Sequence, residues 1–147
     1  MSWSAITATE VKTRLTGAEL TALQTVALAS GQTDPLVEII EQVVDEVRGY
    51  ISANTSNTLG ASGTVPSKLI SAALAIIRYR LCTRLPVKSL LTEDRVKENK
   101  AAIRLLEQVA AGKFAIEDPN SGDRSGVSIE QASTPTRNAT RTKLAGL

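Results

Sequence analysis

Residues 65–81, VPSKLISAALAIIRYRL, decide the fold of this chain because they predict a helix with a wide apolar surface. From Leu69 to Leu81 the apolar positions recur at helical spacing, and alanines widen the stripe that they form. A stripe this wide predicts burial on more than one side of the helix. The same stretch carries several cations and no acid. Its polar surface is therefore expected to be basic.

A helix of opposite charge is predicted immediately before it, in residues 36–51, LVEIIEQVVDEVRGYI. Asp34 can cap its start, and Pro35 suits a first helical position, where its missing N–H would be unpaired anyway. Many residues here are β-branched, but the apolar positions follow helical spacing rather than strict alternation, so we predict a helix and not a strand. Gly49 interrupts the pattern, and we expect it to allow another helix to cross closely.

Two short helices are predicted near the start of the chain. Thr7 with Glu10, and Thr16 with Glu19, have the capping-box spacing, in which a hydroxyl and a carboxylate satisfy free backbone N–H groups at a helix start. The second helix is expected to stop at Gly31. Two caps in succession predict two helices joined by a tight corner.

The remaining segments complete an all-α prediction. Thr92 is expected to cap a last long helix that ends at Gly112, and residues 52–64 are small and polar, which is typical of a loop. We therefore predict a compact bundle of four to five helices, two short and three longer, in a helical domain over residues 1–117. Residues 118–147 lack a continuous apolar face and are expected to be a flexible tail that becomes ordered on assembly.

The composition argues against catalysis. The chain of 147 residues has no histidine and one cysteine, Cys82, which excludes intrachain disulfides, histidine general bases and His/Cys zinc sites. Because Cys82 lies in an apolar helix, we expect a small buried side chain rather than a nucleophile. Phosphate-loop, nucleophile-elbow and metal-ligand motifs are absent from the sequence. We therefore expect no enzyme, no cofactor and no metal site.

Charge and hydropathy also limit the partners. A net charge of +2 is too small to imply nucleic-acid binding by itself. No window approaches the roughly 18 apolar residues of a membrane span, and the first residues lack the pattern of a signal peptide. We expect a soluble protein made in a reducing cytoplasm, with no membrane partner.

Two charged groups are candidate contact residues. The acids of residues 36–51 favour a solvated or intersubunit face over magnesium binding, and they are Glu38, Glu41, Asp45 and Glu46. No acid lies between Val65 and Thr92. The cations of that region fit three alternatives, which are a solvated helix edge, pairing with carboxylates of a neighbouring subunit, and contact with DNA phosphates. These cations are Lys68, Arg78, Arg80, Arg84 and Lys88.

The tail has a basic end that is a third candidate. It contains no acid after Glu130, and a segment that orders only on binding can wrap an adjoining subunit. The residues expected to dock a partner are Arg137, Arg141, Lys143, Leu144 and Leu147.

Four stretches carry a resemblance to a known family. In order they are DEVRGYI at 45–51, Val65-Pro66 with Leu69, IRYRL at 77–81, and IRLL at 103–106 leading to VAAGK at 109–113. Their order and spacing resemble the small all-helical head–tail connector, or head-completion, proteins of tailed bacteriophages, especially the Mu-like branch. The resemblance covers residues 5–117.

The resemblance implies a subunit of the virion neck, made in the host bacterial cytoplasm. Such proteins assemble into a ring, commonly twelvefold, beneath the portal protein. The ring extends the DNA channel, contacts passing DNA without sequence preference, and offers a platform for a tail-terminator or neck protein. On this reading the acids of residues 38–46 in one subunit face Arg78, Arg80, Arg84 or Lys88 of the next.

An alternative from another class is a small cytoplasmic helical DNA-binding regulator that places the basic helix in a groove. The modest net charge and the apolar character of residues 69–77 argue against it, because a recognition helix needs a polar face.

Overall fold

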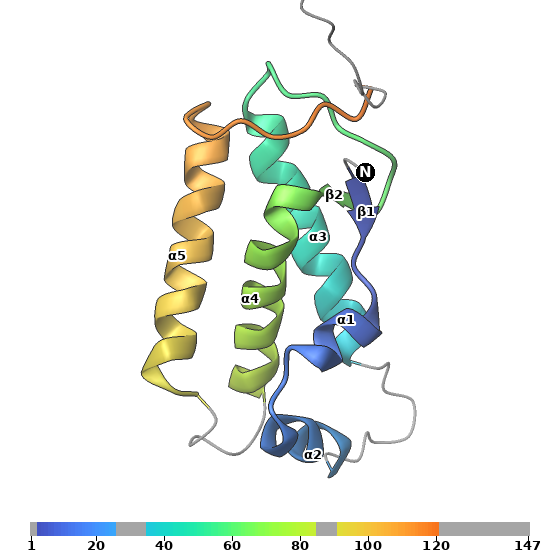
Figure 1. The fold of residues 1–147 in the computed structure, drawn as a ribbon, viewed down its shortest axis with the longest axis vertical. Helices are drawn as coiled ribbons and strands as arrows, with labels where there is room; N and C mark the ends of the chain where they lie inside the picture. The colour runs from blue at the N-terminus through green and yellow to red at the C-terminus, as the bar shows by residue number, and fades with distance from the viewer. Residues whose placement is uncertain (1–2, 26–34, 85–90, 121–147) are drawn as a thin grey trace, which may run out of the picture.

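A computed structural model describes residues 3–25, 35–84 and 91–120, which form a helical bundle with one small sheet (Figure 1). The three long helices lie side by side, with α4 between α3 and α5 in the view of Figure 1. The elements are β1 Trp3–Ala5, α1 Ala8–Thr13, α2 Gly17–Thr25, α3 Pro35–Ala53, β2 Thr64–Pro66, α4 Ser67–Arg84 and α5 Glu93–Ala110. Two short and three long helices were expected, and the predicted all-α fold is confirmed.

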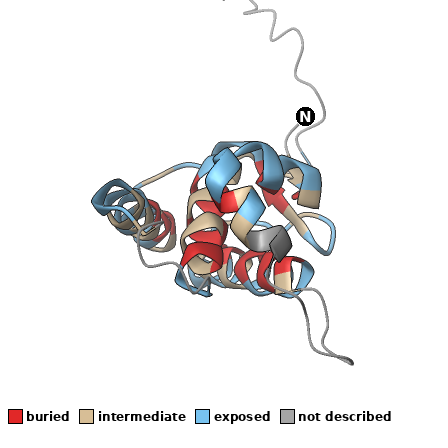
Figure 2. Cartoon of the chain, turned by 90° about the horizontal axis from the view of Figure 1, so that it is seen from below, coloured by how far each residue is buried: buried red, intermediate tan, exposed pale blue. Residues whose placement is uncertain are grey.

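The core lies where α3, α4 and α5 meet, and buried residues gather on the sides of the helices that face one another (Figure 2). The wide apolar stripe of α4 is buried as predicted, because α4 packs against both α3 and α5. Burying one such aliphatic side chain contributes about 1.5–3 kcal/mol. The buried residues of α4 are Leu69, Ala72, Ala73, Leu74, Ile76, Ile77, Leu81 and Cys82.

The two predicted capping boxes are confirmed. The Thr7 N–H donates to Glu10 Oε2 over 2.8 Å, and the Glu10 N–H donates to Thr7 Oγ1 over 3.3 Å. The same exchange joins Thr16 and Glu19, with distances of 2.7 and 3.4 Å. These caps start α1 and α2 as short, separate helices. The predicted stop at Gly31 lies outside the described residues.

The cap and the terminator predicted for α5 are also confirmed. Thr92 Oγ1 accepts a hydrogen bond from the Arg95 N–H, and Gly112 follows the helix with a φ of 73°. An L side chain rarely adopts this left-handed conformation, which glycine reaches at little cost.

The two-stranded sheet was not expected. Strands β1 and β2 pair antiparallel, with Ser4 opposite Val65. The predicted loop over 52–64 is therefore wrong at both ends, because α3 continues to Ala53 and β2 begins at Thr64. Val65 and Pro66 belong to this strand, and α4 starts only at Ser67. Three-residue strands are too short to show an alternating pattern, and their partners are far apart in the sequence.

Arg48 and Trp3 hold the loop that joins α3 to β2. The Arg48 guanidinium donates to the carbonyls of Gly60, Ala61 and Thr64 over 2.8–3.1 Å, and it lies 6.0 Å from the centre of the Trp3 ring. Gly60 packs so closely on this ring that an added Cβ would lie 2.7 Å from it. The loop is therefore tied to the bundle by named contacts.

Gly49 has a different environment from the one predicted. A Cβ at this position would meet nothing within 4 Å, and the residue is exposed. The prediction of a close helix crossing here is wrong, because Gly49 lies on a side of α3 that no other described element covers.

Candidate assembly surfaces

The acids of α3 divide into an exposed set and one paired residue. Glu38, Glu41 and Asp45 are exposed, and Glu38 accepts a hydrogen bond from Gln42 over 3.2 Å. Neither Glu41 nor Asp45 forms an ion pair within the described residues. Glu46 is instead half-buried and forms a salt bridge with Arg80 of α4. The predicted acidic face is thus present, but one of its four members is occupied within the chain.

Two of the exposed acids, Glu41 and Asp45, line an open hollow of about 440 Å³, here called the α3 hollow. Val37 in its lining is 48% exposed, which is unusual for an aliphatic side chain among the residues that the structure describes. Buried apolar residues and exposed carboxylates share the lining. It consists of Ile6, Ala8, Val37, Ile40, Glu41, Val44, Asp45, Ser62 and Gly63.

The predicted cations of α4 have three different environments. Arg78 forms an ion pair with Glu98 of α5 and donates to the Arg14 carbonyl over 2.9 Å. Arg80 pairs with Glu46 of its own chain, whereas the sequence prediction paired these residues between subunits. Arg84 is exposed in the last turn of α4, where a cation complements the helix dipole.

The remaining predicted contact residues are Lys68, Lys88 and the tail residues. Lys68 is exposed at the opposite end of α4 and reaches the Ala115 carbonyl over 3.5 Å. Lys88 lies outside the described residues. So do the five tail residues, Arg137, Arg141, Lys143, Leu144 and Leu147.

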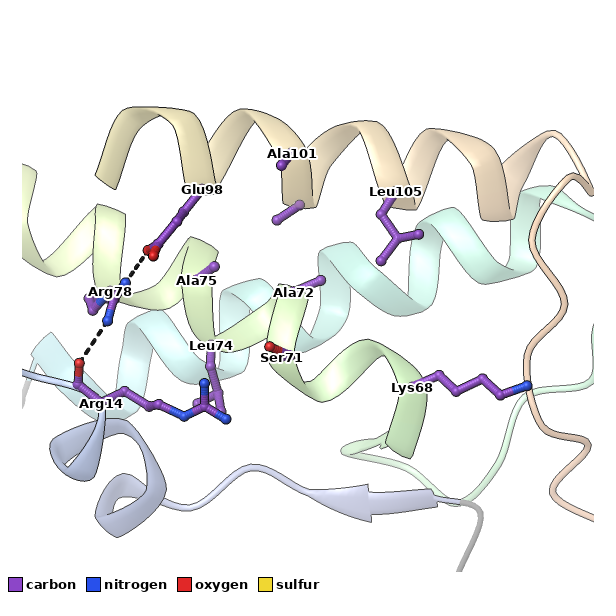
Figure 3. A pocket seen from close by; sticks show the side chains of 11 residues that line it. Arg14, Lys68, Ser71, Ala72, Leu74, Ala75, Arg78, Glu98, Ala101 and Leu105 are labelled. Atoms are coloured by element: carbon purple, nitrogen blue, oxygen red, sulfur yellow. Dashed lines mark hydrogen bonds and ion pairs between the residues drawn. The ribbon is translucent and has the colours of Figure 1, made fainter. Parts of the chain in front are cut away.

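A second hollow, of about 340 Å³, lies between α4 and α5 and is here called the α4–α5 hollow. In Figure 3, Arg78 lies between Glu98 and the Arg14 carbonyl at one end of the hollow, and Lys68 lies at the other end. Alanines, two leucines and one serine line the hollow between the two charged ends. The lining consists of Arg14, Lys68, Ser71, Ala72, Leu74, Ala75, Arg78, Glu98, Ala101, Ala102 and Leu105.

A buried carboxylate at the foot of the bundle was not expected. Glu19 of α2 is only 2% exposed, and its Oε1 atom accepts a hydrogen bond of 2.7 Å from Arg95 Nε of α5. The Cys82 thiol of α4 also donates to this atom, over 3.3 Å. The capping pattern located Glu19 in a helix start, but its distant partners gave no sequence signal.

The charge of Glu19 is stabilised where it is buried. Burial alone would raise the pKa of this carboxyl group, but hydrogen bonds from Thr16, Cys82 and Arg95, with the Arg95 charge, outweigh burial and hold the pKa below its ordinary value of 4.5. Glu19 is therefore ionised at neutral pH and links three helices. The arrangement attaches the short helix α2 to α4 and α5.

Cys82 is buried, as predicted. Burial, followed by the hydrogen bond and charge of Glu19, raises the pKa of the thiol to about 11. The thiolate, which is the reactive form, is therefore scarce at neutral pH. Its position in the structure is that of a small core side chain with one weak hydrogen bond.

Two general properties apply to the described residues alone. Residues 3–25, 35–84 and 91–120 contain no cluster of three or more acidic, cysteine or histidine side chains placed to hold a metal ion. Within the same ranges no helix combines the length and the apolar character that a membrane crossing requires.

Comparison with known proteins identifies the family. The profile described as Bacteriophage Mu, Gp36 matches residues 6–133. The chain belongs to the bacteriophage Mu Gp36 family. No curated protein and no solved structure matches the chain significantly. Because the Gp36 match spans all five described helices, the bundle and both hollows belong to a phage protein of Mu-like type. Membership of the Gp36 family suggests a role in phage structure or morphogenesis.

Proposed function

We propose that this Gp36-family chain is a virion structural protein of the neck, a head–tail connector subunit that acts by assembly. In this proposal many copies form a ring beneath the portal protein, commonly twelvefold by the resemblance described above. The ring extends the DNA channel without reading DNA sequence, and it presents a platform to the next neck or tail protein.

One observation supports assembly most directly: the chain has two separate hollows of opposite charge. The α3 hollow carries Glu41 and Asp45, whereas the α4–α5 hollow carries three cations and one acid. No residue lines both hollows. A subunit with two unlike surfaces can make head-to-tail contacts, and such contacts close into a ring when the rotation between neighbours fits.

The core supports the same proposal. The three long helices bury an aliphatic core within a single chain, so a monomer is able to fold before it assembles. The hollows then remain available at its surface. A neck component that joins a particle after its own synthesis requires this separation between folding and assembly.

Mass measurement and electron microscopy test the proposal. The purified full chain is analysed alone and after mixing with the portal protein of the same phage. A ring of the chain on the portal is the expected result. A chain that stays monomeric and leaves the portal unchanged at all ratios would contradict the proposal.

A DNA-binding regulator is less well supported. A recognition helix needs a polar, accessible face, but Leu69, Ala73 and Ile77 of α4 are fully buried in the core. A salt-titrated gel shift separates the two functions. The connector is expected to bind duplexes weakly and without preference, whereas a regulator would prefer one sequence.

A further inference from the structure

We propose that the α3 hollow of one subunit binds residues 137–147, RNATRTKLAGL, of a second copy. The inference rests on the proposed function, because it names the surfaces through which copies of the chain meet. It assigns an occupant to the hollow and a binding site to the basic segment.

The hollow has the chemistry of a site for a basic, partly apolar segment. Val37 exposes 48% of its surface there, and buried Ile40 and Val44 continue the apolar lining along the same helix. Glu41 and Asp45 are exposed on this lining and form no ion pair within the described residues. An occupant with cations and aliphatic side chains would cover the apolar surface and neutralise both carboxylates.

The segment supplies these groups. After Glu130 the sequence contains three cations, Arg137, Arg141 and Lys143, and no acid. Leu144 and Leu147 follow within a few residues, so the aliphatic groups adjoin the cations. A segment of this composition has too little apolar surface to fold alone, but it can become ordered when it binds a partner.

The α4–α5 hollow does not fit the same segment. Its lining includes Arg14, Lys68 and Arg78, and its one acid, Glu98, already pairs with Arg78. Cations of the segment would be repelled there. Of the two hollows, charge therefore favours the one on α3.

The chain length permits contact with a neighbouring subunit. The last described residue is Asn120, and the nearby Glu117 carbonyl accepts a hydrogen bond of 2.9 Å from Trp3 Nε1, which places this part of the chain beside β1. Residues 121–136 separate it from the segment, and 16 residues span at most about 55 Å when extended. That reach exceeds the width of a small helical bundle, so the segment can extend to an adjacent copy.

A binding experiment tests the hollow directly. The full chain carrying R137E/R141E/K143E, here called the acceptor variant, cannot use its own segment and keeps the hollow intact. A fluorescein-labelled peptide of residues 134–147 is titrated with this variant, and anisotropy is recorded at several salt concentrations. We expect saturable binding that weakens as salt increases.

Two further variants make the result specific. Adding E41K/D45K to the acceptor variant should weaken peptide binding at least about tenfold, which corresponds to about 1.4 kcal/mol. Adding E93K/E107K instead makes the same charge change at exposed positions outside both hollows, and it should leave binding unchanged. Equal binding to all three proteins, or no binding to any, would overturn the proposal.

A mixing experiment tests whether the segment comes from a second copy. The donor variant, E41K/D45K with an intact segment, is mixed with the acceptor variant, and the mass of the complex is measured. The expected product is a one-to-one pair that does not grow further, while each variant alone stays monomeric. Wild-type chain at dilutions where it is monomeric should bind the peptide as tightly as the acceptor variant. Binding about tenfold weaker would show that the chain's own segment fills the hollow, and it would overturn the intersubunit contact.

The outcomes also separate this inference from the proposed function. If E41K/D45K chains still form rings on the portal and the peptide does not bind, the connector function stands and the docking contact fails. If the peptide binds as expected but wild-type chain neither forms rings nor engages the portal, the contact stands and the connector function fails.

Discussion

Arg95 of α5 contacts Glu19 of α2 through two nitrogens, because its Nε and one terminal nitrogen both lie 2.7 Å from Glu19 Oε1. The Glu19 side chain is 2% exposed and the Arg95 side chain is 15% exposed. A charge pair this far from solvent depends on both partners being present. Glu19 alone would be an uncompensated buried charge, and Arg95 alone would keep only a longer contact of 3.9 Å to the exposed Glu98. The contact fixes α2 to the foot of the bundle.

Replacing Glu19 by alanine should therefore lower the free energy of unfolding by about 3 kcal/mol. The substitution leaves Arg95 with only the longer contact of 3.9 Å to Glu98, and it also removes the carboxylate that caps the start of α2. Urea unfolding followed by circular dichroism measures the change. Glu93→Ala is the matched control, because Glu93 is exposed and its ion pair with Lys97 spans 3.8 Å. A Glu19→Ala loss no larger than the control's would show that the contact does not hold α2.

The same carboxylate should make stability depend on pH. Its pKa in the folded chain is below its ordinary value of 4.5, so at acidic pH the unfolded chain binds more protons than the folded chain and stability falls. The contribution of Glu19 is fully present above about pH 4.5 and is lost as the pH falls through the lower, folded-state pKa. Urea unfolding of the wild type and of Glu19→Gln at pH values from 6 to 2 tests this. The difference in the free energy of unfolding between the wild type and the variant should shrink as the pH falls. A difference that stays constant over this pH range would contradict the prediction.

Most of the helical fold could be predicted because its signals are local. Each capping box involves residues three positions apart, and the stripe of α4 is visible within residues 65–81. The pairing of β1 with β2 could not be predicted in this way. It joins Trp3 to Pro66, and a three-residue strand has too few positions to show a period.

The candidate site could be predicted only in part, for a related reason. Sequence identifies the exposed carboxylates of α3 and the cations of α4, but it does not give the register in which two helices pack. Glu46 and Arg80 proved to be neighbours within one chain, where the sequence prediction had paired such residues between subunits. The two hollows are lined by residues from segments far apart in the sequence, including α1, α5 and the loop before β2. No single stretch of sequence therefore predicts either hollow.

Cys82 should react slowly with thiol reagents while the chain is folded. Its pKa of about 11 keeps the thiol protonated at neutral pH, and the side chain is buried. We expect modification by 5,5′-dithiobis(2-nitrobenzoate) to be on the order of 100-fold faster in denaturing urea than in buffer. Absorbance at neutral pH follows the reaction. Equal rates in the two conditions would contradict the buried position.

Two glycines should respond oppositely to alanine. At Gly60 an added Cβ would lie 2.7 Å from the Trp3 ring, so Gly60→Ala should destabilise the chain by about 1–3 kcal/mol through overpacking. At Gly49, inside α3, the Cβ would meet nothing within 4 Å. Gly49→Ala should therefore stabilise the helix by about 0.5–1 kcal/mol. Thermal unfolding measures both changes: the unfolding temperature should fall for Gly60→Ala and rise for Gly49→Ala. A change in the same direction for both variants would contradict the packing described for Trp3.

Charge reversal at Arg80 and at Arg84 should separate folding from assembly. Arg80→Glu places two carboxylates side by side at Glu46, so we expect the free energy of unfolding to fall by about 1 kcal/mol. Adding Glu46→Arg should restore much of that loss by rebuilding the pair in reverse. A failure of Glu46→Arg to rescue Arg80→Glu would show that the two side chains do not act as a pair.

Arg84 is exposed and has no ion partner within the described residues, so Arg84→Glu should lower the free energy of unfolding by less than about 1 kcal/mol. If Arg84 faces a neighbouring subunit, its reversal should still weaken ring formation on the portal, measured by native mass spectrometry. Unchanged ring formation with Arg84→Glu would show that Arg84 is not part of the contact between subunits.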